Sequence, residues 1–199
     1  SAFTKLNIRR QNTLIDVKDS PAFDVVIGNP PWGSVITEAE RQLFAQVYES
    51  AQGICDPYAL FLEKGLKLLK PGGFLAYVLP ESFLNITCHH HIRHVVLSSV
   101  TVRSISLRGY DFKTINAPVI TLVVQNLHPS EVHRFKFKGL TNSGYISQKK
   151  CLDNEFHVII GELTADDAEI LKQMESIPGV TYLKGQAQFD MGIVTGNNK

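Results

Sequence analysis

Residues 23–32, FDVVIGNPPW, constrain this chain more than any other part of it. Three consecutive β-branched residues at 25–27 predict a short buried strand. Gly28 then lets the backbone turn without a Cβ clash. Because a proline fixes its own φ at about −65° and keeps the preceding residue extended, residues 29–31 cannot continue as a helix. The stretch therefore predicts a buried strand that ends in a stiff corner with its polar groups facing outward.

This corner suits a specific chemistry. In open α/β sheets, ligands bind beyond the carboxyl ends of the strands. The side-chain oxygen of Asn29 and the carbonyl oxygen of Pro30 would there be two acceptors for an amino group with two hydrogens to donate. Trp32 adds a flat face on which a planar base can stack. Together they would hold an amine in position to attack an electrophile. The alternative is structural: a strand, a Pro-Pro turn and a Trp in the core.

The corner also carries a family resemblance. Asn29, Pro30, Pro31 and Trp32 resemble the (Asn/Asp/Ser)-Pro-Pro-(Tyr/Phe/Trp) motif of S-adenosylmethionine-dependent amino-methyltransferases. Residues 56–84, DPYALFLEKGLKLLKPGGFLAYVLPESFL, resemble the segment that follows this motif in DNA adenine methyltransferases. The resemblance implies that these four residues are catalytic and that Trp32 stacks on the base. It also implies S-adenosylmethionine as the cofactor and double-stranded DNA as the partner.

Two further roles are implied by the resemblance alone. In the family, a loop after a later strand supplies an aromatic ring against the flipped base. Phe112 matches that position, and Tyr110 is the second candidate. An acidic residue before the Asn-Pro-Pro strand helps to hold the adenine ring of the cofactor in the family. Here the nearest polar side chain is Asn12, so Asn12 and Asn29 are the cofactor-binding candidates.

The fold implied by the resemblance is α/β, a doubly wound, Rossmann-like sheet of the class I S-adenosylmethionine-dependent methyltransferases. No G-x-G strand-loop precedes residue 23, so we expect the N-terminal cofactor half of the sheet to be largely missing. We therefore expect this piece alone to bind the cofactor weakly and to be inactive. The family's first strand would pair beside residues 24–28. We expect N-terminal residues or a second copy of the chain to cover that edge.

Local signals predict the elements around the corner. A capping box at residues 37–40 opens a helix, and Asp56 begins a second one, on which Glu63 and Lys67 pair on the solvent side. Three strands are predicted beyond this helix, at residues 74–79, 100–107 and 118–124. The first is an almost unbroken apolar run, which is typical of the middle of a parallel sheet with both faces covered.

The pattern changes past residue 125. Residues 133–138, HRFKFK, alternate basic with aromatic side chains, which predicts either an edge strand or a ribbon that follows phosphates. We favour the edge strand. Residues 141–152 are polar and predict a loop. Residues 164–174 predict a further helix, which Pro178 and Gly179 end.

The last residues carry a second resemblance. Residues 192–199, GIVTGNNK, resemble the stretch that begins the target-recognition domain of type IIG-like adenine methyltransferases. We therefore expect a fragment in three parts. These are the catalytic half of a methyltransferase domain (1–127), a connecting β/α segment (128–188) and the start of a truncated recognition domain (189–199).

Composition narrows the class of protein. The formal net charge of +1 does not by itself indicate a nucleic-acid partner. Neither a membrane span nor a secretory signal is evident, so we expect a cytoplasmic protein. The 3 cysteines are dispersed and indicate reduced thiols. His90 and His94 have the i,i+4 spacing of a metal-binding pair but lack an acidic or Cys partner nearby. We therefore favour a solvated helix start and expect no metal.

The sequence thus predicts the catalytic part of a DNA adenine-specific methyltransferase of a type II or IIG-like restriction-modification system. A methyl group would pass from S-adenosylmethionine to the exocyclic amine of a flipped adenine. Two alternatives stay open. Protein-glutamine and rRNA-guanine methyltransferases share the corner, but the long continuation beyond Val124 favours DNA. The other alternative is a non-catalytic specificity or assembly module, against which the intact motif argues.

Overall fold

A computed structural model describes residues 8–52, 56–111, 117–161, 170, 173–174 and 176–181. The chain divides into two compact units, Ser1–Glu162 and Leu163–Lys199. In the second unit, residues 170, 173, 174 and 176 are helical, and Gly179 has a φ of +85° in the turn that follows. This agrees with the predicted helix and its end. The boundaries expected at residues 127 and 188 stay predictions.

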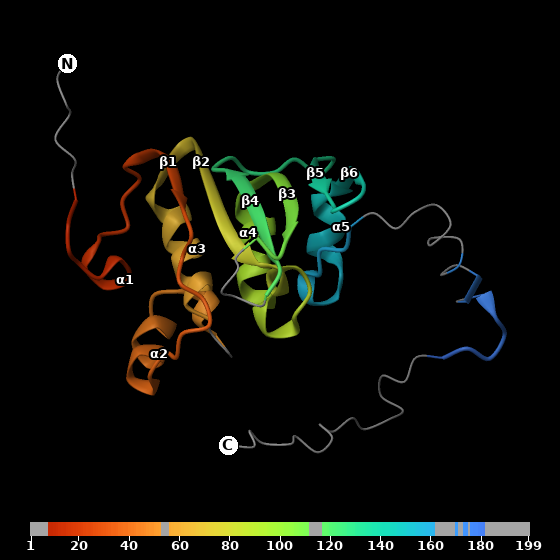
Figure 1. The fold of residues 1–199 in the computed structure, drawn as a ribbon, viewed down its shortest axis with the longest axis horizontal. Coiled ribbons are helices and arrows are strands. Elements are labelled where there is room, and N and C mark those ends of the chain that lie inside the picture. Colours follow the sequence, from red (N-terminus) through yellow and green to blue (C-terminus); the bar gives the residue numbers. More distant parts are fainter. Residues whose placement is uncertain are drawn as a thin grey trace. The chain divides into compact units, whose positions relative to one another are not determined.

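The first unit is built on a six-stranded mixed sheet (Figure 1). Its strands are β1 (Phe23–Gly28), β2 (Leu69–Pro80), β3 (Thr101–Gly109), β4 (Val119–Gln125), β5 (Arg134–Lys138) and β6 (Ser143–Ser147). They lie in the order β1-β2-β4-β3-β5-β6. β1 pairs parallel to β2 and β3 parallel to β5, whereas β4 runs antiparallel to both its neighbours and β6 antiparallel to β5. The carboxyl ends of β1, β2, β3 and β5 therefore share one rim of the sheet.

The described helices that pack on the sheet lie on one of its faces. The helices are α1 (Thr13–Asp16), α2 (Glu38–Ala45), α3 (Pro57–Leu68), α4 (His90–Ser99) and α5 (Gln148–Asp153), with 3₁₀ turns η1 (Glu49–Ala51), η2 (Glu81–Leu84), η3 (Thr87–His89) and η4 (Glu155–His157). α3 packs on β1 and β2, α4 on β3 and α5 on β6, and α4 contacts both α3 and α5. Figure 1 shows the strands in front of α3 and α4. These helices and the sheet bury the main apolar core.

Close packing of α3 on β2 depends on Gly65. A Cβ at this position would lie 2.6 Å from Leu75 Cδ1 and 2.8 Å from the Tyr77 hydroxyl. Burial raises the pKa of Tyr77 to about 12. Because only glycine lets the helix approach the strand this closely, Gly65 fixes the distance between a helix that begins near the corner and a strand that ends on the same rim as β1.

Three predictions about the sheet and its connections are wrong. The strand predicted at 74–79 lies in β2, but β2 pairs with antiparallel β4 and only one of its faces is covered by described helices. β5 contains most of the predicted edge strand, yet it lies between β3 and β6. The predicted loop at 141–152 instead forms β6 and α5. The sequence did not predict β6 because the few apolar residues of this strand pack beside β5, a contact that local composition does not reveal.

The predicted helix starts are confirmed. The side chain of Thr37 caps α2 in a full capping box with Glu40, and the side chain of Asp56 caps α3. Glu63 and Lys67 form their ion pair at 3.0 Å, but Glu63 is buried and not on the solvent side. Its carboxylate accepts hydrogen bonds from the backbone N–H groups of Glu49 and Ser50.

β1 lies at the edge of the sheet and its side chains are largely exposed, so the prediction of a buried strand at residues 25–27 is wrong: the strand forms, but described residues pair with only one of its edges. The exposed fractions are 50% for Phe23, 58% for Val25 and 74% for Ile27. No described residue pairs with its free edge, and the described N-terminal helix α1 contacts α3 instead. Cover by residues 1–7, which lie outside the described part, or by a second copy stays a prediction. Within the described ranges, no helix combines the length and apolar character needed to cross a membrane.

Candidate active site

The Asn-Pro-Pro-Trp corner lies directly beyond the carboxyl end of β1, as predicted. Asn29 is exposed, Pro30 is buried, and Trp32 is half-buried against the main core. The buried proline anchors the corner to the protein, and the exposed amide faces solvent. The purely structural alternative, with Trp32 sealed in the core, does not describe this arrangement.

Trp32 and Asn29 contact each other. The indole Nε1–H of Trp32 donates a hydrogen bond to Oδ1 of Asn29 at 3.2 Å. This bond orients the carboxamide, because only the oxygen of an amide can accept it. A carbonyl oxygen has two lone pairs, so Oδ1 keeps capacity for a second donor. The sequence predicted separate roles for the two side chains and did not reveal that one holds the other.

Asp56 stabilises the corner through hydrogen bonds to its backbone. Its carboxylate oxygens accept the backbone N–H of Gly33 at 3.4 and 3.2 Å, and one of them also accepts the N–H of Tyr58 in the first turn of α3. Gly33 has a φ of +70°, which a residue with a Cβ rarely adopts. One carboxylate therefore joins the end of the motif to the start of α3. The sequence predicted only the capping role of Asp56.

The same rim carries the ends of β2 and β3. η2 continues directly from Pro80, and its Glu81 N–H donates to the Pro118 carbonyl at 2.9 Å just before β4. Tyr110 follows the end of β3 and is 68% exposed. Phe112, the favoured base-stacking candidate, lies outside the described residues. Both aromatic assignments stay predictions.

Arg93 holds η2 in place, and sequence reasoning did not single it out. Its fully buried guanidinium donates from Nη1 to the carbonyls of Phe83 at 2.8 Å and Ile86 at 2.9 Å. Its Nε and Nη2 donate to the carbonyl of Phe156 at 3.1 and 2.8 Å. Burial lowers the pKa of Arg93 below its ordinary value. The available signal was its place beside Ile92, one turn before Val96, on the apolar side of α4.

Asn12, the weaker cofactor candidate, caps α1. Its Oδ1 accepts the Leu14 N–H at 3.0 Å, and its own N–H donates to Asp16 Oδ2 at 2.7 Å. The side chain is exposed and precedes β1 in the chain. These contacts give Asn12 a local structural role. A role toward the cofactor stays a prediction for Asn12 and for Asn29.

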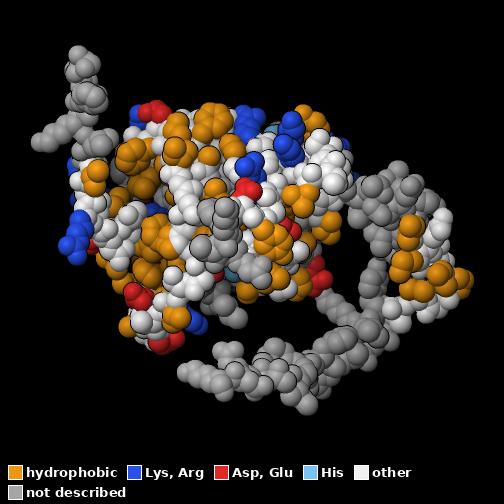
Figure 2. Space-filling view, viewed as in Figure 1, with side chains coloured by type: hydrophobic (Ala, Val, Ile, Leu, Met, Phe, Trp, Pro, Cys, Tyr) orange, Lys and Arg blue, Asp and Glu red, His pale blue; other side chains and the backbone are white. Residues whose placement is uncertain are grey.

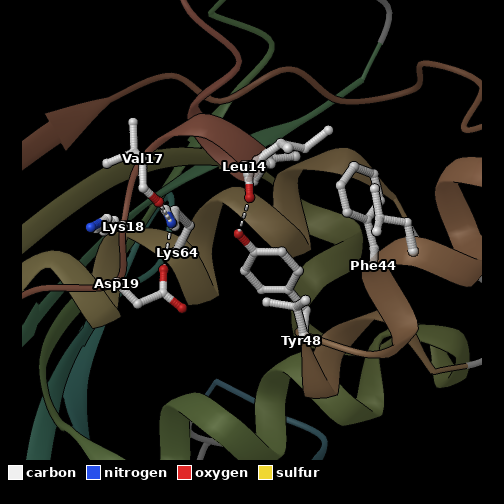
Figure 3. A pocket seen from close by; sticks show the side chains of 10 residues that line it. Leu14, Val17, Lys18, Asp19, Phe44, Tyr48 and Lys64 are labelled. Atoms are coloured by element: carbon white, nitrogen blue, oxygen red, sulfur yellow. Dashed lines mark hydrogen bonds and ion pairs between the residues drawn. The ribbon is translucent and has the colours of Figure 1, made fainter.

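Figure 3 shows a cavity of about 300 Å³ where α1, α2 and α3 meet. The Tyr48 hydroxyl donates to the Leu14 carbonyl at 2.7 Å. The Lys64 ammonium donates to the Val17 carbonyl and to the Asp19 carboxylate. These bonds tie the segment before β1 to α3. None of the corner residues lines this cavity.

The charges around this cavity compensate one another. Burial by itself would raise the pKa of Asp19, but the hydrogen bond to Lys64 and the positive charges of Lys64 and Lys67 lower it below its usual value. Burial, helped by the negative charges of Asp19 and Glu63, raises the pKa of Tyr48 to about 12. Asp19 is therefore ionised and Tyr48 neutral at neutral pH.

The histidines at the start of α4 are less solvated than predicted. His89 is buried, and its burial lowers its pKa. His90 Nδ1 lies 2.9 Å from the Thr87 carbonyl, and His94 Nδ1 lies 3.1 Å from Glu49 Oε1. The two candidate ligands thus have separate partners. Within the described ranges, no group of three or more His, Cys, Asp or Glu side chains could hold a metal ion.

Comparison with known proteins shows which family the chain resembles. A model of the family described as Eco57I restriction-modification methylase matches residues 3–114. The chain is 27% identical to the type II methyltransferase M.VspI of Vibrio sp. strain 343 over 177 residues, which is 89% of this chain and 43% of that protein. It is 34% identical to the type II restriction enzyme and methyltransferase RM.Eco57I of Escherichia coli over 76 residues, which is 36% of this chain and 8% of that protein. The chain spans less than half the length of these relatives.

Solved structures share the fold. A protein described as a class I S-adenosylmethionine-dependent methyltransferase from Listeria monocytogenes superposes with a TM-score of 0.50 at 21% identity, over 82% of this chain and 45% of that chain. The methyltransferase subunit of a type I restriction-modification system from Streptococcus thermophilus superposes with a TM-score of 0.50 at 18% identity, over 83% and 34% of the two chains. The mixed sheet is therefore Rossmann-like, which confirms the predicted fold class.

Proposed function

The chain belongs to the Eco57I restriction-modification methylase family, and on this basis we propose that it is the catalytic part of a DNA methyltransferase specific for adenine. The methyl donor is S-adenosylmethionine, and the acceptor is the exocyclic amine of an adenine rotated out of the duplex. The observation that supports this proposal best is the outward-facing Asn29, whose side-chain oxygen is oriented by Trp32 at the carboxyl rim.

The corner acts on the amine by accepting its hydrogens. Asn29 Oδ1 takes one hydrogen with its second lone pair, and the Pro30 carbonyl takes the other. Both bonds leave the nitrogen lone pair directed away from the acceptors and free to attack. Bound S-adenosylmethionine would supply the methyl group and leave as S-adenosylhomocysteine, and the methylated amine would release its proton to solvent. Fixed acceptors of this kind lower the barrier through orientation and electrostatics, with no strong base required.

The described residues fit the base better than the cofactor. The amide, the proline carbonyl and the indole suit a planar ring that bears an amino group. For S-adenosylmethionine, the candidates are the amides of Asn12 and Asn29, and no described residue is assigned to its amino-acid part. S-adenosylmethionine supplies the methyl group when it is bound. The catalytic roles proposed for Asn29, Pro30 and Trp32 therefore concern the substrate base.

The decisive variant is Asn29→Ala in the complete gene product. Loss of one positioned acceptor typically lowers the rate about 100- to 1,000-fold. We expect that loss in methyl transfer to duplex DNA from radiolabelled S-adenosylmethionine, with DNA affinity retained. Gln42→Ala, which removes an exposed amide on α2, is the matched control and should retain full activity.

Analysis of the methylated nucleosides tests the substrate separately. N6-methyladenine is the expected product. Methylated cytosine would contradict adenine specificity while leaving amine methylation intact. Equal losses of DNA affinity and rate in Asn29→Ala would mean that the corner only supports the fold.

A further inference from the structure

The face of the sheet opposite α3, α4 and α5 has an apolar half and a cationic half. The strand register aligns one row of side chains across all six strands: Ile27, Ala76, Val123, Ser104, Lys136 and Tyr145. The next row toward the carboxyl rim contains Val78, Thr121, Ser106, Lys138 and Ser143. The first row is apolar on β1, β2 and β4, the second row has the apolar Val78 on β2, and both rows are polar on β3, β5 and β6. In Figure 2, hydrophobic side chains predominate over β1 and β2, and Lys and Arg gather over the β3–β5 region.

We call the polar half of these two rows the phosphate strip: Ser104 and Ser106 on β3, Lys136 and Lys138 on β5, and Ser143 and Tyr145 on β6. In each row a lysine lies between two hydroxyl side chains. Both lysines are exposed, and the Tyr145 side chain is 56% exposed. The buried Phe135 and Phe137 alternate with the cations and hold β5 in register on the core. The strip is thus a rigid set of donors on a packed strand.

The strands of this region carry positive charge only. The sequences of β3, β4, β5 and β6 contain no Asp or Glu but five cations: Arg103, Arg108, Arg134, Lys136 and Lys138. Of these, Arg108 pairs at 2.9 Å with Asp111, which follows β3. The whole chain has a net charge of only +1. Neither Lys136 nor Lys138 forms an ion pair with a described residue. Residues two apart on a strand are separated by about 6–7 Å, so the two ammonium groups repel each other. A partner with regularly spaced negative charges would relieve that repulsion.

We propose that the phosphate strip binds the sugar-phosphate backbone of duplex DNA beside the target base. Lysine and hydroxyl side chains are the groups with which proteins contact phosphate oxygens. β5 is parallel to β3 and ends at the same rim as β1, so the row with Lys138 lies toward the rim that carries Asn29. The inference rests on the proposed function and adds a surface to it. The strand order already rules out an edge strand at residues 133–138, and the proposal agrees with the alternative prediction of a ribbon that follows phosphates.

The test compares two charge-neutralising pairs in the complete gene product. Lys136→Gln/Lys138→Gln removes two cations from the strip. Lys18→Gln/Lys150→Gln removes two exposed cations elsewhere, before β1 and on α5. Fluorescence anisotropy of a labelled duplex is measured over a series of salt concentrations for the wild type and both pairs. Each phosphate contact contributes about 0.9 to the slope of log affinity against log salt concentration, so the strip pair should lower that slope by about 2.

Methyl transfer to the same duplex separates this inference from the proposed function. A lower slope in the strip pair alone, with a raised KM for DNA, supports the strip. Equal slopes in both pairs, with wild-type methyl transfer intact, would overturn the strip and leave the function standing. A wild-type protein that neither binds nor methylates DNA would overturn both. Circular dichroism confirms that the exposed substitutions leave the fold unchanged.

Discussion

Trp32 has two contacts with different consequences at the corner after β1. Its ring packs against the core and leaves one part exposed, which suits stacking on a base. Its N–H holds the oxygen of Asn29 in one orientation. A tyrosine or phenylalanine at this position would retain the flat ring but could not donate from the same point. The hydrogen bond therefore makes this particular aromatic residue part of the positioning of the acceptor.

Trp32→Phe tests this positioning role. The variant keeps a ring and loses the donor, and a typical hydrogen bond contributes about 0.5–1.5 kcal/mol. We expect kcat for methyl transfer to fall about 2- to 10-fold. The fluorescence of 2-aminopurine placed at the target position, which reports stacking, should change little. A large fluorescence change with an unaltered kcat would show that Trp32 acts only by stacking.

Among the elements, α4 stabilises the carboxyl rim of the sheet through contacts with the turns beside it. α4 carries no candidate catalytic residue. Its Arg93 nevertheless joins η2 and η4 to α4, because the guanidinium donates hydrogen bonds to three backbone carbonyls in or beside these two turns. η2 begins where β2 ends, on the same rim as the corner. The guanidinium is fully buried and bonded to carbonyls, so its charge is stabilised by dipoles. This arrangement stabilises one geometry of the rim and makes it sensitive to a single side chain.

Replacing Arg93 with Met should destabilise the first unit by about 3 kcal/mol. The substitution keeps an unbranched apolar stem, and it leaves buried carbonyls without their donors. Urea unfolding followed by circular dichroism measures the free energy of unfolding. Arg10→Met, at an exposed position before α1, is the control and should cost little. A loss below about 1 kcal/mol for Arg93→Met would mean that water or the backbone replaces the donors.

At the scale of the whole molecule, described helices cover one face of the sheet. The other face changes from apolar side chains at β1 and β2 to cationic side chains at β5. The apolar half of that face is continuous with the exposed β1 edge, and the cationic half is continuous with the rim at β3 and β5. The first unit also depends on an ion pair between segments 45 residues apart, in which the nearly buried Lys64 meets Asp19. That pair makes the stability of the unit depend on pH.

The pH dependence has a defined sign. The pKa of Asp19 is lowered in the folded state, so its stabilisation is present above the unfolded pKa and is lost as pH falls through the folded pKa. Asp19→Asn has the shape of the protonated acid. We expect it to be less stable than the wild type by about 1 kcal/mol at neutral pH and equally stable at about pH 2. Chemical denaturation at the two pH values measures this, and a difference that persists in acid would contradict it.

Local sequence determined where several strands, helix ends and turns of this protein lie. The strand at 23–28, both helix caps and the outward corner at Asn29 follow from propensities and dihedral limits that act within a few residues. Those limits hold whatever surrounds them. The motif at the rim could therefore be located, and its fold class named, from the sequence and its resemblance.

Only the tertiary structure decided which residues are buried and which strands are neighbours. Glu63 is buried because η1 packs on α3, and Arg93 is buried because a segment 63 residues away supplies its acceptor. β5 is an interior strand because β6 pairs with it, and the phosphate strip exists only through that register. Such contacts join residues far apart in the chain. Their free energy depends on the whole packed arrangement, so no short stretch of sequence encodes it.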